Sequence, residues 1–269
     1  MLNKIKSSYI MHKIFKFIKN KRKLNILKHN KEIMNRIIIT KEDFKAYEIL
    51  KEFNNKYKTN IKDIDIKLLD LEDKKIGNKG LKDLIKINFK GKEIKVLNLR
   101  YNNISDINVL ENIKFEELEI LRLDNNEISD INILEKANFK ELQELNLRYN
   151  KISDINILEK VNFKELQELY LSGNKISDIN VLEKVNFNEL QELNLSHNKI
   201  SDINILEKVN FKELQKLNLS GNEISDIKIL EKVNFKELQE LYLSNNKLDK
   251  KENSSIITNL KSTIKTVLI

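Results

Sequence analysis

One motif recurs through most of the chain and limits what it can fold into. The pattern Leu-x-x-Leu-x-Leu-x-x-Asn-x-Ile returns every 24 residues, as in LQELNLRYNKI at 142–152. It opens at Ile94, Leu118, Leu142, Leu166, Leu190, Leu214 and Leu238. A weaker and longer copy opens at Ile66, with Lys74 in place of the asparagine. Eight similar units predict a stacked array, because a single unit of this length cannot bury its apolar face alone.

Each unit has the pattern of a short strand, a turn and a short helical segment. In residues 142–150, Leu145 and Leu147 alternate with polar residues, the period of two expected for a strand with one buried face. The asparagine that follows is predicted to bond backbone groups that the inward turn leaves unpaired. Farther along, Ser153 and Asp154 are predicted to cap a helical turn.

A phenylalanine also recurs once per unit, after the helical turn. These residues are Phe89, Phe115, Phe139, Phe163, Phe187, Phe211 and Phe235. They are seven of the eleven phenylalanines, so we expect an aromatic line inside the convex half of the stack. After Leu248 the pattern stops, and residues 249–269 are predicted to form a C-terminal capping helix that closes the stack.

These units resemble the leucine-rich repeat family over residues 66–248, about two-thirds of the chain. The copies with Asn-x-Ile-Ser-Asp-Ile are most similar to the short repeats of internalin-like and phosphatase-regulator proteins, and Ile76-Gly77-x-x-Gly80-Leu81 resembles a ribonuclease-inhibitor repeat. The resemblance implies an α/β fold. We expect a right-handed leucine-rich repeat solenoid, with a parallel β-sheet on its concave face and short helices on its convex face.

Residue types that carry catalysis or bind metals are absent or scattered. The chain has no Cys, which excludes disulfides, thiolate zinc sites and cysteine nucleophiles. Its three histidines, His12, His29 and His197, fall in two separate regions. The Asp of each Ser-Asp pair recurs as a ladder of oxygen ligands that suits Ca²⁺, but capping of the helical turns is the simpler interpretation. We therefore predict no enzymatic activity, no cofactor and no metal site.

Variation among the copies falls on the outward strand positions, whereas the convex half is almost constant. With strands about 4.8 Å apart, these positions line a strip about 35 Å long on the concave face. Arg and Tyr often carry the binding energy of protein interfaces. The candidate partner-binding residues are Arg100, Tyr101, Arg122, Asp124, Arg148, Tyr149, Tyr170, His197 and Tyr242. The alternative is a solvated sheet surface on which duplicated copies have drifted apart.

Residues 1–40 form a separate region with its own charge. Residues 1–36 hold eleven Lys and Arg against one Glu, a net charge of +10, so the other 233 residues carry −2 of the total of +8. The segment YIMHKIFKFIKNKRKLNILKHNKEIM is similar to an F-box, a small all-α module that docks on a Skp-type adaptor of a cullin ubiquitin ligase. The resemblance implies these core and adaptor-docking residues: Ile10, Ile14, Phe15, Ile18 and Leu24.

The same basic region allows other interpretations. It has the features of a plain cap for the solenoid, of an amphipathic membrane-surface or targeting segment, or of a basic run at 19–23 for nuclear localisation or nucleic-acid binding. Residues 41–65 are predicted to start a helix after Thr40 that links the two regions. No apolar run approaches the roughly 20 residues that span a bilayer, so we expect a cytoplasmic monomer, with a nuclear location also open.

These features together predict a non-enzymatic protein that binds a protein partner on its concave face. The similarity to an F-box extends this prediction to the substrate receptor of a ubiquitin ligase. The alternative is a scaffold or regulatory subunit of an enzyme such as a phosphatase, without a role in ubiquitin transfer.

Overall fold

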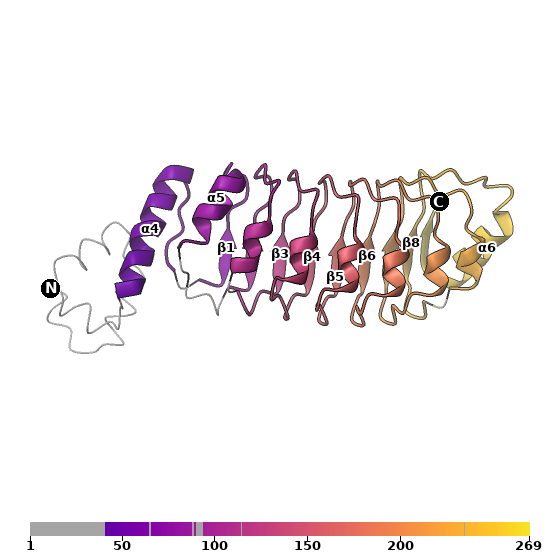
Figure 1. Ribbon diagram of the computed structural model, residues 1–269. Coiled ribbons are helices and arrows are strands. Elements are labelled where there is room, and N and C mark those ends of the chain that lie inside the picture. The colour runs from indigo at the N-terminus through magenta and orange to yellow at the C-terminus, as the bar shows by residue number, and fades with distance from the viewer. Residues whose placement is uncertain (1–40, 65, 88, 90–93, 114, 234) are drawn as a thin grey trace.

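The chain forms one curved stack of coils. The computed structural model describes residues 41–64, 66–87, 89, 94–113, 115–233 and 235–269. Its coils follow one axis from helix α4 (Lys41–Tyr57) to helix α6 (Ser254–Thr263) (Figure 1). The F-box-like segment, residues 1–40, lies outside the described residues. Across the described ranges, no helix combines the length and the apolar character that crossing a membrane requires.

Nine short strands make one parallel sheet, in which each strand pairs with its neighbours in chain order. They are β1 (Leu68–Asp70), β2 (Val96–Asn98), β3 (Ile120–Arg122), β4 (Glu144–Asn146), β5 (Glu168–Tyr170), β6 (Glu192–Asn194), β7 (Lys216–Asn218), β8 (Glu240–Tyr242) and β9 (Thr266–Leu268). The central leucines stand in register from Leu69 of β1 to Leu241 of β8. The predicted parallel sheet is confirmed.

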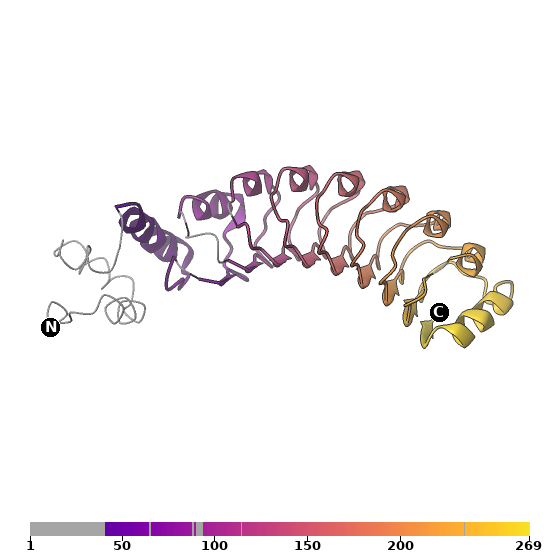
Figure 2. The same ribbon diagram turned by 90° about the horizontal axis from the view of Figure 1, so that it is seen from below.

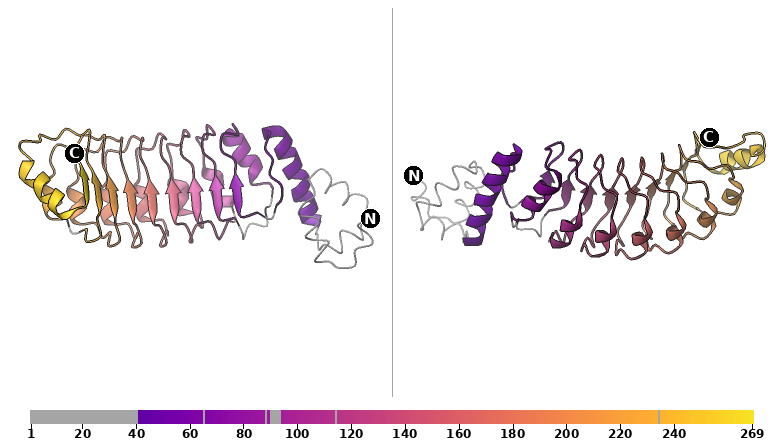
Figure 3. Two further views of the ribbon diagram at one scale, coloured as in Figure 1. Left: turned by 180° about the vertical axis from the view of Figure 1, so that it is seen from behind. Right: turned by 45° about the horizontal axis from the view of Figure 1, so that its top comes forward.

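Short helical segments lie on the opposite side of each coil. Figure 2 shows the sheet along the inner, concave side and these segments along the outer, convex side, and Figure 3 shows the molecule from two further directions. After α5 (Gly77–Leu84) they are 3₁₀ segments: η3 (Asn108–Asn112), η4 (Asn132–Glu135), η5 (Asn156–Glu159), η6 (Asn180–Glu183), η7 (Asn204–Glu207) and η8 (Lys228–Glu231). A 3₁₀ turn suits segments of this length. The predicted short convex helices are confirmed.

The core lies between the sheet and the convex segments. Its strand leucines, turn isoleucines and helical leucines are buried in every regular coil, and so are the recurring phenylalanines from Phe89 to Phe211. Phe235, in the last coil, is half-buried. The first two rings of this line, Phe89 and Phe115, meet edge to face with their centroids 6.3 Å apart. The recurring phenylalanines are therefore buried in the convex half as predicted, and Phe235 is the less buried member.

The recurring asparagines join each coil to the one before it. The Nδ2 of Asn174 donates to the carbonyls of Leu147 and Leu171, at 2.9 and 3.0 Å, and its Oδ1 accepts the N–H of Ile152 at 3.0 Å. The same pattern recurs at Asn126, Asn150, Asn198, Asn222 and Asn246. The predicted pairing of backbone groups by these amides is confirmed, and most of it runs between coils.

Aspartate side chains start the convex turns. The Oδ1 of Asp154 accepts the backbone N–H of Asn156 at 2.8 Å, and the other five aspartates of the ladder make the same contact at 2.8 to 3.0 Å. This is an Asx turn that satisfies a backbone N–H where the helical turn begins. The aspartates thus have a structural role, as predicted, but they lie one residue before the N-cap position, where Ile155 and its equivalents have no side-chain cap.

Helix α4 covers the N-terminal end of the core and begins where the sequence predicts a helix. Its Phe53 is buried. Near its end, Lys56 Nζ and Tyr57 OH donate to a carboxylate oxygen of Asp83 in α5, at 2.6 and 2.8 Å. The hydrogen bond from Lys56 is the main reason that the pKa of Asp83 lies well below its usual range. These contacts fix α4 to the first coil.

The C-terminal end differs from the prediction of a single capping helix over residues 249–269. Helix α6 ends at Thr263, and the chain then forms β9 beside β8. The backbone N–H of Leu243 donates to the carbonyl of Leu268 at 2.7 Å. Without β9, this edge of β8 would have unpaired backbone groups, so the last residues extend the sheet instead of the helix.

Candidate functional site

The open face of the sheet presents four residues from each coil. Because the central leucine of each strand is buried, the residues on either side of it face the concave side. We name four rows by their position relative to that leucine. The opening row precedes it (Leu68, Val96, Ile120, Glu144, Glu168, Glu192, Lys216, Glu240) and the closing row follows it (Asp70, Asn98, Arg122, Asn146, Tyr170, Asn194, Asn218, Tyr242). The third row lies two residues later (Glu72, Arg100, Asp124, Arg148, Ser172, Ser196, Ser220, Ser244), and the turn row comes next (Asp73, Tyr101, Asn125, Tyr149, Gly173, His197, Gly221, Asn245).

The nine predicted partner-binding residues all lie in these rows. Seven of them come from the four adjacent coils of β2 to β5, where the structure brings them side by side: Arg100, Tyr101, Arg122, Asp124, Arg148, Tyr149 and Tyr170. His197 and Tyr242 belong to the coils of β6 and β8, apart from this group. We call Arg100, Tyr101, Arg122, Arg148, Tyr149 and Tyr170 the Arg/Tyr patch.

Two arginines of the patch are held by carboxylates of the next coil. Arg100 Nε donates to Asp124 Oδ2 at 2.7 Å, and this bond raises the pKa of Arg100. Arg122 donates from Nε and Nη2 to the two oxygens of Glu144, at 2.9 and 3.0 Å, in the two-point geometry that suits a guanidinium. Asp124 is only 2% exposed, so it positions Arg100 and is not itself an accessible contact.

Arg148 has a different environment. Its guanidinium carbon lies 4.0 Å from the centre of the Tyr170 ring, a cation–π contact. Within the part of the chain that the structure describes, its Nε has no hydrogen-bond partner. The hydroxyl of Tyr170 donates to Glu168 Oε2 at 2.7 Å, and burial, followed by this bond, raises the pKa of Tyr170. Arg148 is thus placed by an aromatic face, and its Nε is buried.

The turn row projects the largest exposed side chains. Tyr101 and Tyr149 are 47% and 57% exposed, and both have a positive φ. The ring of Tyr149 lies against Gly173, where an added Cβ would be 2.5 Å from Tyr149 Cδ1. His197 lies in the same way against Gly221. Gly173 and Gly221 therefore each make room for the ring of the preceding coil.

The opening row is not among the residues predicted from the sequence. Its first three residues, Leu68, Val96 and Ile120, are aliphatic and stand in register on the concave face. Leu68 is 56% exposed. Comparing this one position across the eight copies would have revealed it, because the residue changes from aliphatic to charged after the third copy.

Comparisons with known proteins agree with this architecture. The profile of the family described as Leucine Rich repeats (2 copies) matches residues 140–184, 188–232 and 212–260. The predicted leucine-rich repeats are therefore confirmed within these residues, and the fold is a leucine-rich repeat solenoid. No curated protein matches the chain by sequence.

Among solved structures, the chain is similar to two internalins of Listeria monocytogenes. The first is 28% identical, with a TM-score of 0.54, over 69% of this chain and 49% of that chain. The second, internalin C2, is 22% identical, with a TM-score of 0.59, over 83% and 91%. A leucine-rich repeat protein of Leptospira interrogans is 25% identical, with a TM-score of 0.51, over 69% and 50%. The chain thus spans about half the length of the first and third structures.

Proposed function

We propose that this leucine-rich repeat solenoid binds a protein partner through the Arg/Tyr patch and has no catalytic role of its own. The observation that carries the proposal is the exposure of Tyr101 and Tyr149 on one sheet face beside the arginines of the third row. Tyrosine and arginine are the residues, together with Trp, that most often dominate interface energies. An exposed aromatic ring with a polar hydroxyl suits a surface that is wet when free and buried when bound.

The contacts within the patch also favour binding over a merely solvated surface. Arg100 and Arg122 are fixed by Asp124 and Glu144, so little side-chain freedom remains to be lost when a partner binds. The parallel ladder beneath them keeps neighbouring coils at one spacing. A partner therefore meets a preformed surface.

Replacing both Arg148 and Tyr149 with alanine is expected to weaken partner binding by about 30-fold or more, because two central interface residues of these types commonly contribute at least 2 kcal/mol together. The melting temperature should change little, since Tyr149 is mainly exposed and Arg148 contacts the Tyr170 ring without an ion pair within the described residues. The measurement compares proteins captured from a lysate of the source cells by the wild type and by the variant, followed by titration of a protein that only the wild type captures.

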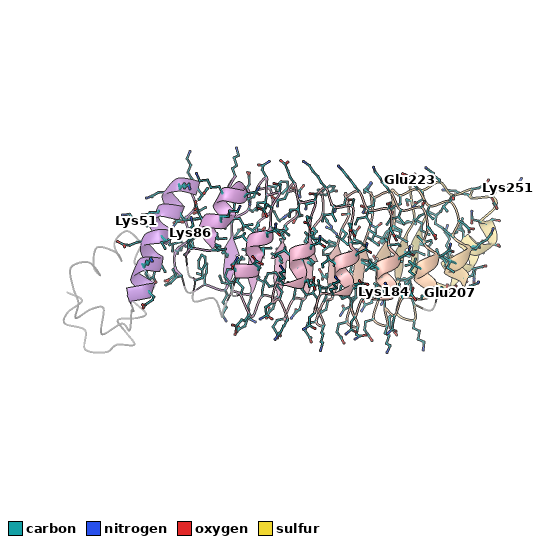
Figure 4. The ribbon with its side chains drawn as sticks, viewed as in Figure 1. Lys51, Lys86, Lys184, Glu207, Glu223 and Lys251 are labelled. Atoms are coloured by element: carbon teal, nitrogen blue, oxygen red, sulfur yellow. The ribbon has the colours of Figure 1, made fainter. Side chains whose placement is uncertain are left out.

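The matched control is the double variant Lys184→Ala and Glu207→Ala. Both residues are exposed near the convex turns, at the edge opposite Glu223 in Figure 4. This control should capture the same proteins as the wild type. Equal capture by the Arg148 and Tyr149 variant would contradict the placement of the site.

We further propose that residues 1–40 dock on a Skp-type adaptor, which would make the solenoid the substrate receptor of a ubiquitin ligase in the cytoplasm or nucleus. The support is the F-box-like sequence, with Ile10, Ile14, Phe15, Ile18 and Leu24 in the core and docking positions, and its place ahead of a binding solenoid. These residues lie outside the described part of the chain.

A pull-down with a purified Skp-type adaptor tests this assignment. The full-length chain should retain the adaptor, and the variant Ile14→Asp with Phe15→Asp should lose it while keeping the same thermal transition of the solenoid. If the full-length chain retains no adaptor, or the variant retains as much as the wild type, the ubiquitin role is wrong. The scaffold or regulatory-subunit alternative then remains.

A further inference from the structure

The opening row changes character along the sheet. Leu68, Val96 and Ile120 come from β1, β2 and β3 in exact register, so neighbouring side chains are about 4.8 Å apart. Leu68 is exposed, and the other two are half-buried. From β4 to β6 the same position holds Glu144, Glu168 and Glu192, and β7 has Lys216 there. An aliphatic strip thus passes directly into a line of carboxylates.

The carboxylates of this line are not equally available. Glu144 is occupied by both donors of Arg122, and its side chain is 13% exposed. Glu168 and Glu192 lie on either side of the Tyr170 hydroxyl, at 2.7 and 3.3 Å. A hydroxyl has one proton, so it can donate to only one of them at a time.

Glu168 and Glu192 are also directly opposite each other in the parallel ladder. Like charges in that position repel each other. Lys216 Nζ lies 3.2 Å from Glu192 Oε1 and offsets part of the charge. Glu168 forms no ion pair within the described residues, although the charge of Arg122 acts on it and that of Arg148 acts on the Tyr170 hydroxyl. Among these residues the two carboxylates therefore have one direct cationic partner, Lys216.

The concave face as a whole also has an acidic excess. The four rows hold eight carboxylates, which are Asp70, Glu72, Asp73, Asp124, Glu144, Glu168, Glu192 and Glu240. They hold four cations, Arg100, Arg122, Arg148 and Lys216, which gives a net charge of −4. A charged surface of this sign attracts a cationic partner and disfavours an acidic one.

We propose that the opening row binds a partner segment with aliphatic residues at one end and Lys or Arg at the other. The inference rests on the proposed function, because it names the chemistry of a partner on the same face. The aliphatic side chains pack on Leu68, Val96 and Ile120, and the cationic side chain reaches the Glu168–Glu192 pair. Binding then buries the aliphatic side chains at one end of the opening row and neutralises the carboxylates farther along it.

The distance between the aliphatic residues and the Glu168–Glu192 pair determines the length of the bound segment. The Glu168–Glu192 pair lies about two to three strands, or about 12 Å, beyond Ile120. An extended chain rises about 3.4 Å per residue and directs every second side chain to the same face. Aliphatic residues at positions 1 and 3 of a bound strand therefore place positions 5 and 7 beside the carboxylates. The heptapeptide Leu-Ser-Leu-Ser-Lys-Ser-Lys satisfies this geometry.

Fluorescence anisotropy of this labelled heptapeptide, titrated with the full-length protein, tests the proposal. The wild type should bind it at least tenfold more tightly than the same peptide with Glu in place of both Lys. The variant Glu168→Gln with Glu192→Gln should lose at least tenfold in affinity for the Lys peptide. Leu68→Ser, a change at an exposed side chain, should also weaken binding, whereas Glu168→Lys should shift the preference toward the Glu peptide.

The control is Glu159→Gln with Glu183→Gln, which removes two charges from the convex turns. Binding unchanged in this control, together with the losses above, supports the proposal. No binding of the Lys peptide, equal binding of both peptides, or an equal loss in the control overturns it. Loss of the captured partner by the Arg148 and Tyr149 variant, without peptide binding, refutes only this inference. Peptide binding with a partner that is insensitive to that variant refutes the proposed Arg/Tyr patch instead.

Discussion

Replacing Asn174 with alanine is expected to lower the free energy of unfolding by about 3 kcal/mol or more, since each buried backbone group left unpaired costs about 1–3 kcal/mol. The amide bonds carbonyls of two successive coils and accepts one N–H, and its side chain is buried. Alanine leaves these groups without partners in a space that is closed to solvent. Urea unfolding followed by circular dichroism measures the change.

Asn180→Ala is the matched control for this variant. Asn180 is exposed at the start of η6, and it is the backbone N–H of Asn180, not its side chain, that bonds to Asp178. We expect its effect to stay within about 0.5 kcal/mol, the usual range for surface substitutions. Similar losses for Asn174→Ala and Asn180→Ala would mean that the asparagines do not join the coils energetically.

Replacing Phe163 with alanine is expected to cost about 3–5 kcal/mol, the range for deleting a fully buried aromatic ring. Phe163 is 1% exposed and lies in the middle of the stack, so neighbouring coils on both sides limit collapse of the cavity. The same urea titration reports the loss. A broadened transition would indicate that the two halves of the array unfold separately, as nearest-neighbour coupling in repeat proteins allows.

Phe235→Ala provides the comparison at the end of the same line. Phe235 is half-buried beside a cavity of about 330 Å³ between the last coil and α6, which Leu238 and Leu260 also line. Because part of this ring already faces open space, its removal should cost less than half as much as that of Phe163. Equal losses at the two positions would show that burial along the aromatic line does not govern stability.

The repeat determined most of the fold that could be predicted. Successive copies have the same residue types at the places of Leu145, Asn150 and Asp154. A structural role inferred for one of these residues therefore applies to its equivalents in the other copies. Their outcomes in the structure are a buried strand centre, a bond between coils and an Asx turn. Such repetition separates a structural role from coincidence even in a single sequence.

Features that occur once were harder to predict. Strand β9 has three residues and no copy elsewhere, and the apolar residues around it fit the spacing of a helix equally well. Strand β9 forms because the edge of β8 is free to pair with it. The residues around β9 do not reveal that contact.

The candidate site was predicted in part, for a similar reason. Strand alternation placed the Arg and Tyr residues on the concave face, but it could not show that Asp124 is buried under Arg100. That burial depends on the side chains of the neighbouring coil. The aliphatic start of the opening row was missed because Leu68 and Val96 look like ordinary strand residues until the register places them side by side.

The direction of the asparagine bonds has a consequence for how such a protein changes in length. Each amide ties its own coil to the preceding one, and the first coil, which has no regular coil before it, has Lys74 at this position. Every internal junction is therefore chemically alike. Duplication or deletion of one 24-residue unit leaves all remaining junctions intact. Evolution can therefore lengthen or shorten the concave face without changing either end of the solenoid.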